Sequence, residues 1–188
     1  MSLTIPNLLS LLRMGLVPFF VIAMIDGQPR RALAVFVVAG VTDALDGSIA
    51  RIYHQQSLLG SYLDPIADKL LLTSAYVALS IPGLNHGTAI PVWVTVLVIA
   101  RDVLLVVMAL VLHLALGIKK FPPSVLSKIT TAVQVGAVVL VLLSSLFAGL
   151  EPVALGAIYL VGALTLASGL DYIIRVNRLS AEKGSAAP

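Results

Sequence analysis

The chain has 188 residues, of which 59% are hydrophobic and 11% are charged. A composition this apolar excludes a water-soluble globular domain and is typical of an integral membrane protein. The net charge of +3 would suggest a nucleic-acid partner in a soluble protein. In a membrane chain, basic residues instead mark topology and headgroup contacts, so we expect membrane lipids and no nucleic acid around the protein. The sequence contains no cysteine, which excludes disulfide bonds.

The apolar segments predict an all-α fold, an integral membrane bundle of about six transmembrane helices. We expect one domain over residues 1–179 and a disordered polar tail over residues 180–188. Residues 5–16 combine a leucine-rich face with polar interruptions, which predicts an N-terminal segment that starts in the membrane interface. This segment lacks a basic start and a cleavage site, so we expect it to stay in the mature protein. Pro18 allows a bend before the chain crosses, and Arg13 is interpreted as a snorkelling anchor, with a headgroup contact as the alternative.

The later spans follow from the remaining apolar runs. They are predicted at about residues 30–54, from Gly60 onwards, and at about residues 90–117, 124–148 and 152–176. Proline and glycine are frequent in residues 81–91, which predicts a turn there and neither a helix nor a strand.

Two of these spans carry basic residues that are candidates for binding an acceptor phosphate. Arg101 and Asp102 lie in the middle of their span, and adjacent side chains leave a helix about 100° apart. We therefore expect each to find a partner on another helix, with a substrate phosphate as the alternative partner of Arg101. Lys128 lies near the start of the next span, where a phosphate-binding role is favoured over an interface anchor.

Four carboxylates interrupt two spans that are otherwise apolar, and an ionisable residue there predicts a functional site. On the first of these helices Asp43, Asp46, Gly47 and Ala50 fall at i, i+3, i+4 and i+7, so they share one face. The small side chains on this face allow a neighbouring helix or a phosphate-bearing ligand to approach the backbone.

The next helix repeats the pattern, because Gly60, Asp64 and Asp68 fall at i, i+4 and i+8. A short turn between antiparallel helices would bring the two acidic faces together. Four converging carboxylates require cations among them, and ligands that are all oxygen favour Mg²⁺ or Mn²⁺ over zinc. The alternative, a set of inter-helix hydrogen bonds, does not account for the desolvation cost of four carboxylates.

The acidic cluster is expected near one membrane surface and not at the midplane. Asp43 lies about 16 Å before the end of its predicted helix, and Asp64 lies about 6 Å inside the next one. With both termini inside, most basic residues in loops and at helix ends face the cytoplasm. We therefore expect a protein of the cytoplasmic (inner) membrane whose active site opens to the cytoplasm.

The motif residues resemble a known family. The pattern from Asp43 to Asp68, including Arg51 after Ala50, matches the signature of the CDP-alcohol phosphatidyltransferases at every fixed position. The similarity extends from Ile5-Pro6-Asn7 to Gln134, so it covers most of the chain.

This resemblance implies a metal-dependent transfer of a phosphatidyl group from CDP-diacylglycerol to a hydroxyl, with release of CMP. It implies metal ligation by Asp43, Asp46 and Asp64, while Asp68 acts as the base and also contacts a second metal. It places Gly47, Ala50, Arg51 and Gly60 at the nucleotide and implies a homodimer. Asn7 joins Arg101 and Lys128 as a candidate for the acceptor side.

The resemblance is strongest to the branch that uses glycerol-type acceptors, either phosphatidylglycerol or glycerol 3-phosphate. Phosphatidylglycerophosphate synthases typically carry Arg-Glu where this chain has Arg101-Asp102, and a two-lysine run where it has Lys128 alone. Both departures favour a less anionic acceptor, so we expect phosphatidylglycerol as acceptor and a cardiolipin synthase, with phosphatidylglycerophosphate synthase as the alternative.

Two other classes of function fit the same residues less well. A cation-coupled transporter would use the carboxylates, but transporters bind at the midplane between repeats, and no repeat is apparent here. A purely structural membrane scaffold would have no use for four aspartates.

Overall fold

The computed structural model describes residues 5–53, 58–84, 87–116 and 124–184. For residues 5–7, 44–53, 58–65, 68, 109–116 and 176–184 only the backbone is described.

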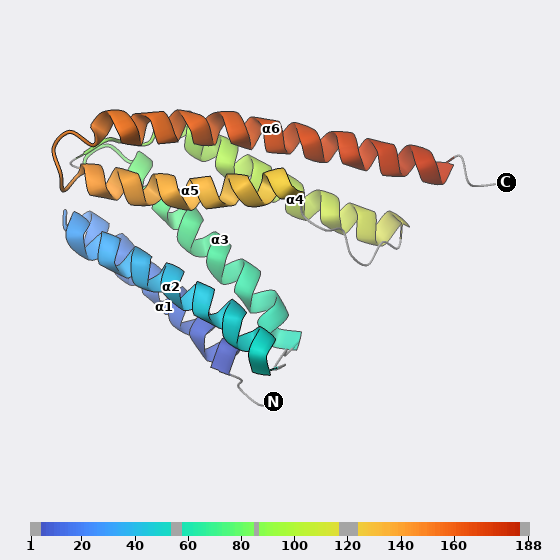
Figure 1. Ribbon diagram of the computed structural model, residues 1–188, viewed down its shortest axis with the longest axis horizontal. Helices are drawn as coiled ribbons and strands as arrows, with labels where there is room; N and C mark the ends of the chain where they lie inside the picture. The colour runs from blue at the N-terminus through green and yellow to red at the C-terminus, as the bar shows by residue number, and fades with distance from the viewer. Residues whose placement is uncertain (1–4, 54–57, 85–86, 117–123, 185–188) are drawn as a thin grey trace. The chain divides into compact units, whose positions relative to one another are not determined.

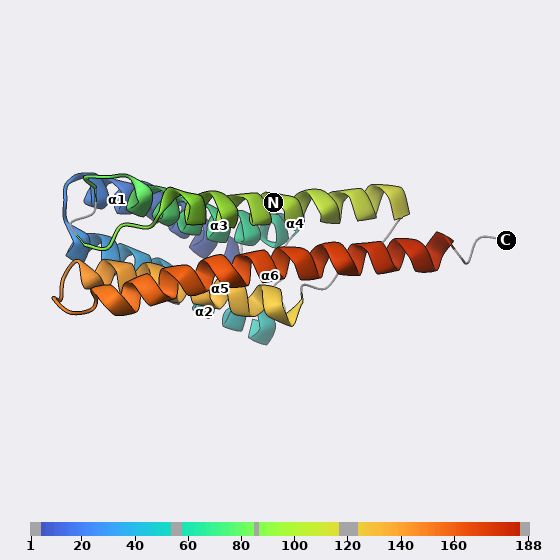
Figure 2. The ribbon, with the colours of Figure 1, turned by 90° about the horizontal axis from the view of Figure 1, so that it is seen from above.

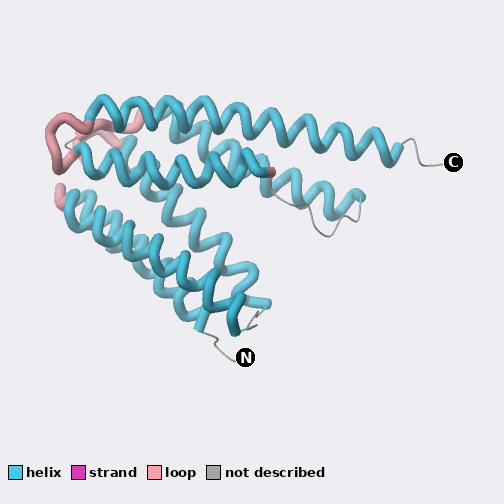
Figure 3. The backbone as a smooth tube through the Cα atoms, in the orientation of Figure 1, coloured by secondary structure: helices cyan, strands magenta, loops and turns pink. Residues whose placement is uncertain are grey.

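The described chain consists of helices and connecting loops, without a strand (Figures 1 and 3). The predicted all-α class is therefore confirmed. The helices are α1 (Ile5–Ile25), α2 (Pro29–Tyr53), α3 (Leu58–Ser80), α4 (Val92–Leu116), α5 (Val125–Ser144) and α6 (Glu151–Gly184). Each predicted span corresponds to one of them, and the described residues between Ser80 and Val92 form neither helix nor strand, as predicted.

Three segments of the described chain are long and apolar enough to cross a membrane. They are Leu8–Ile25 in α1, Val125–Ser144 in α5 and Glu151–Arg175 in α6. The protein is thus a membrane protein by these helices, while the full set of six spans stays a prediction. Helix α1 continues through Pro18, and α6 continues through Gly184 into the region where we expected a disordered tail.

The chain divides into two compact units, and the first consists of residues 1–91 and 138–155. In this unit α1 packs against both α2 and α3 (Figure 1). Phe20 on α1 and Phe36 on α2 are both buried, and their ring centroids lie 5.9 Å apart. Gly27 adopts a φ of 64°, which only glycine accepts readily, and it ends α1 so that the chain returns along α2.

The second unit consists of residues 92–137 and 156–188. It contains α4 and most of α5 and α6, and the C-terminal part of α6 extends past the start of α5 (Figure 2). Trp93 on α4 contacts Tyr159 on α6, with ring centroids 6.2 Å apart. Further along the same two helices, Tyr172 is buried against three apolar side chains of α4: Leu104, Leu105 and Met108.

Candidate active site

The aspartates of the motif lie on two helices of the first unit. Asp43 and Asp46 lie on α2, and Asp64 and Asp68 lie on α3. Because the spacing within each pair is three or four residues, the two positions of each pair fall on the same face of their helix. The glycines and Ala50, together with Arg51, lie on the same helices, and their side chains are outside the described residues, as are those of Asp46, Asp64 and Asp68.

Asp43 is the motif carboxylate whose side chain the structure describes, and it pairs with an arginine of α1. Nη1 of Arg13 lies 2.7 Å from Oδ1 of Asp43. The arginine side chain is 1% exposed, whereas the aspartate side chain is 47% exposed. The guanidinium therefore approaches the carboxylate from the protein interior and leaves the carboxylate accessible.

This contact corrects the interpretation of Arg13 as a snorkelling anchor. A snorkelling side chain keeps its charged end in water or among headgroups. Arg13 instead lies among the most deeply buried large side chains of the described chain. A buried guanidinium is retained where an opposite charge compensates its desolvation, and Asp43 supplies that charge.

The donor set of the motif fits a divalent cation, since four carboxylates offer only oxygen ligands. Among the side chains that the structure describes, no group of three metal-ligating residues occurs. Three of the four aspartates fall outside that set, so the assignment of the metal ligands stays a prediction.

Arg101 is the centre of a second polar cluster, which belongs to the second unit. It is 5% exposed, and its Nη2 donates to the hydroxyls of Ser127 on α5, at 2.5 Å, and Ser168 on α6, at 2.9 Å. Its Nη1 donates to Oδ1 of Asp102 at 2.9 Å. The expectation that Arg101 finds partners on other helices is confirmed by Ser127 and Ser168. The argument that it would not pair with Asp102 was wrong, because the long arginine side chain also turns back to its neighbour.

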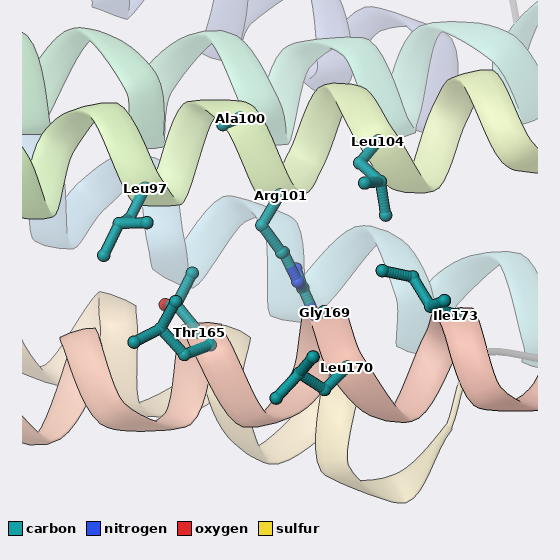
Figure 4. Close-up of a pocket in the computed structure, with 9 residues that line it drawn as sticks. Leu97, Ala100, Arg101, Leu104, Thr165, Gly169, Leu170 and Ile173 are labelled. Atoms are coloured by element: carbon teal, nitrogen blue, oxygen red, sulfur yellow. The ribbon is translucent and has the colours of Figure 1, made fainter.

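Arg101 also lines a groove of about 210 Å³ between α4 and α6 (Figure 4). The other lining side chains are mostly aliphatic. Figure 4 shows Leu97 and Leu104 on α4, one on either side of Arg101, and Leu170 and Ile173 on the facing helix α6. The groove therefore combines an apolar wall with a single, already paired cation.

Lys128, the other basic acceptor candidate, and Arg175, a further cation of the second unit, are less enclosed than Arg101. Lys128 is exposed. Arg175, on α6, pairs with Asp171 one turn earlier, with its Nε 3.0 Å from Oδ2. The side chain of Asn7 lies outside the described residues.

Sequence reasoning missed the partners of the two buried arginines. Ser168 carried a signal, since a hydroxyl in an apolar span is a natural hydrogen-bond partner for a buried charge. The pairing of Arg13 with Asp43 carried only the general signal that opposite charges in neighbouring spans compensate each other.

Comparison with known proteins supports the similarity noted in the sequence. The sequence model of the family described as CDP-alcohol phosphatidyltransferase matches residues 3–168. A human protein named cardiolipin synthase (CMP-forming) is 36% identical over 181 residues, which cover 88% of this chain and 58% of the human protein. A protein of Mycobacterium tuberculosis named probable phosphatidylglycerophosphate synthase is 35% identical over 181 residues, covering 92% of this chain and 81% of that protein.

A cardiolipin synthase (CMP-forming) of Streptomyces coelicolor is 40% identical over 117 residues, which cover 59% of this chain and 52% of that protein. The chain thus spans less than two thirds of the length of the human and Streptomyces relatives. The family match nevertheless includes both motif helices and most of the described chain. The chain belongs to the CDP-alcohol phosphatidyltransferase family.

Proposed function

We propose that the protein transfers the phosphatidyl group of CDP-diacylglycerol to a hydroxyl of phosphatidylglycerol, producing cardiolipin and CMP. The observation that carries this proposal is the complete eight-residue family motif, distributed over α2 and α3 in one compact unit. Members of the family generally depend on a divalent cation and use CDP-alcohols and lipid acceptors. Which cation and which acceptor this chain uses are part of the proposal.

The reaction joins the acceptor hydroxyl oxygen to the phosphatidyl phosphorus and breaks the bond from that phosphorus to the oxygen of CMP. In the proposal Asp43, Asp46 and Asp64 would hold the cation, and Asp68 would also contact a second one. A bound Mg²⁺ or Mn²⁺ would neutralise the pyrophosphate and the charge that develops on CMP.

Residues of the chain perform the remaining steps of this mechanism. Asp68 accepts the proton of the attacking hydroxyl, as a general base does when it is within reach of the acceptor. Gly47 and Ala50 add little bulk, so the nucleotide can approach the backbone of α2 closely. Arg51 and Gly60 complete the proposed nucleotide site.

The charges around the acceptor candidates favour phosphatidylglycerol over glycerol 3-phosphate. A soluble phosphate dianion calls for a compact basic pocket, and Arg101, Lys128 and Arg175 are the available cations. Arg101 and Arg175 are each already paired with an aspartate, and Lys128 is exposed. Two of the three positive charges are therefore compensated within the protein, which suits an acceptor of lower charge.

Glycerol 3-phosphate remains the second candidate acceptor, because the Mycobacterium tuberculosis relative named for phosphatidylglycerophosphate synthesis covers nearly the whole chain. The deciding experiment offers purified protein labelled CDP-diacylglycerol with each acceptor separately. The proposal expects cardiolipin from phosphatidylglycerol. Phosphatidylglycerophosphate from glycerol 3-phosphate, with no cardiolipin from phosphatidylglycerol, would replace it with the second candidate.

The same assay tests the transporter alternative, because a transporter reconstituted in vesicles would move ions without releasing CMP. We further propose that the protein is a homodimer in the cytoplasmic membrane with its site open to the cytoplasm. A monomeric mass in mild detergent, with activity retained, would contradict the dimer.

A further inference from the structure

Arg13 lies outside the motif, on a different helix from the motif residues. It lies on α1, the helix that packs against both α2 and α3, which carry the four motif aspartates. Its side chain is 1% exposed and its Nη1 lies 2.7 Å from Oδ1 of Asp43. A third helix, α1, thus places a buried guanidinium next to the first aspartate of the motif.

The two partners differ in their exposure, and this difference suggests that the buried arginine holds the more exposed carboxylate in place. Arg13 is enclosed, whereas the side chain of Asp43 is 47% exposed. A carboxylate has two oxygens with about four lone-pair positions, so a bond from Arg13 to Oδ1 leaves acceptor capacity at Oδ2. Carboxylates that ligate metals are commonly fixed in this way by a hydrogen bond from an outer partner.

We propose that Arg13 is a positioning residue that holds the carboxylate of Asp43 in place for the divalent cation. This inference rests on the proposed function, since it takes Asp43 to be a metal ligand. It assigns to α1 a role in the metal site that lies outside the motif on α2 and α3.

The sign of the effect on metal affinity distinguishes this role from simple electrostatics. A guanidinium next to a ligand repels a divalent cation, so its removal would tighten metal binding if charge alone mattered. If the guanidinium orients the carboxylate, its removal weakens metal binding, typically by about 10- to 100-fold for an outer partner of a metal ligand.

The test measures Mn²⁺ binding to the full chain in lipid nanodiscs without donor or acceptor, by the loss of the free Mn²⁺ signal in electron paramagnetic resonance. Arg13→Gln should raise the Kd for Mn²⁺ by about 10- to 100-fold. Arg13→Lys keeps the charge and can still donate a hydrogen bond, but it lacks the planar fork of arginine, so its Kd should lie between those of Arg13→Gln and wild type. Arg31→Gln is the matched control: it removes the same charge from an exposed position on α2, about 18 Å along the helix from Asp43, and should leave the Kd unchanged.

A second readout separates positioning from general damage to the fold. The Mn²⁺ concentration that gives half-maximal turnover should rise in Arg13→Lys, while kcat at saturating Mn²⁺ stays close to wild type. A lowered kcat with an unchanged metal requirement would indicate a structural role and overturn the inference.

Unchanged or tighter Mn²⁺ binding in a folded Arg13→Gln protein would also overturn it. If that variant does not fold, the comparison of Arg13→Lys with wild type decides by the same criteria. A wild-type protein that binds no Mn²⁺ would instead contradict the metal site of the proposed function.

Discussion

Arg101 and Asp102 are neighbours in the sequence and form an ion pair, with Nη1 of the arginine 2.9 Å from Oδ1 of the aspartate. The same guanidinium donates through Nη2 to the hydroxyls of Ser127 and Ser168. One buried side chain therefore connects α4, α5 and α6 within the second unit. The planar, forked donor group of arginine makes this possible, since a lysine ammonium presents a compact point charge instead.

Replacement of Arg101 by Met should lower the stability of the protein by about 3–5 kcal/mol, because it removes the cation that pairs with the largely buried Asp102. The double variant Arg101→Met with Asp102→Leu should recover most of this loss, since removal of both partners of a buried pair is often neutral. Thermal unfolding in detergent micelles measures both effects. The control is Arg175→Met, which breaks the more exposed pair with Asp171 and should cost no more than about 1 kcal/mol. Equal losses in the two single variants would contradict the prediction.

The positions of the helices could be predicted from the sequence. Long apolar runs predicted the six helices of the described chain, and the irregular stretch after Ser80 was expected from Pro82 and Gly83. Gly83 has a φ of 93°, a conformation that ends regular structure and that glycine adopts readily. These signals are local, so they can be read without knowledge of how the helices pack.

The partners of the buried charges could not be predicted, because they depend on the packing of one helix against another. Periodicity fixes the face of a helix on which Arg13 lies, but it does not fix which neighbour covers that face or at what height. The same limit applies to Arg101, whose nearest carboxylate was excluded on the angle between adjacent side chains. That argument neglected the length of the arginine side chain, which is long enough to reach a neighbour that leaves the helix about 100° away.

Gly162 on α6 allows close contact with Trp93 on α4, since a Cβ at this glycine would lie 3.0 Å from the indole ring. Gly162→Ala should therefore destabilise the protein by about 1–3 kcal/mol, and Gly162→Leu should destabilise it more. The matched control is Gly156→Ala on the same helix, where nothing lies within 4 Å of the added Cβ. This control should be neutral or slightly stabilising, by up to about 1 kcal/mol. The same thermal unfolding assay applies, and a Gly162→Ala protein as stable as Gly156→Ala would refute the contact.

Gly87 lies against Ser145 in the first unit, and a side chain added at Gly87 would clash with the backbone of Ser145 as well as with its hydroxyl. An added Cβ would lie 2.5 Å from the serine Oγ and 2.8 Å from its Cα and its amide nitrogen. Because a backbone cannot move aside as a side chain can, Gly87→Ala should destabilise the protein more than Gly162→Ala does. Combining it with Ser145→Gly removes only the hydroxyl contact and should recover little of the loss. Full recovery in the double variant would show that the side chain alone was the obstacle.

Turnover should require Mg²⁺ or Mn²⁺, because the motif offers oxygen ligands only. Excess chelator should abolish CMP release from CDP-diacylglycerol, and either ion should restore it. Asp43→Asn and Asp64→Asn should lose Mn²⁺ binding as well as turnover. Full activity in the presence of excess chelator would end this interpretation of the aspartates.

Asp68 is proposed to act on the acceptor, so its replacement should separate donor binding from catalysis. Asp68→Asn keeps the size of the side chain but removes its ability to accept a proton. Turnover should fall by about 10²- to 10⁴-fold, the usual contribution of a general base. The affinity for CDP-diacylglycerol, measured by equilibrium binding in nanodiscs, should stay close to that of wild type.

The comparison for this variant is Asp64→Asn, on the same helix one turn earlier. Because Asp64 is proposed to hold the cation that contacts the pyrophosphate, its replacement should weaken donor binding as well as turnover. The contrast between the two variants matters more than either value, since both remove one carboxylate from α3. If Asp68→Asn and Asp64→Asn lose donor affinity equally, Asp68 belongs to the binding set and the base must be sought elsewhere.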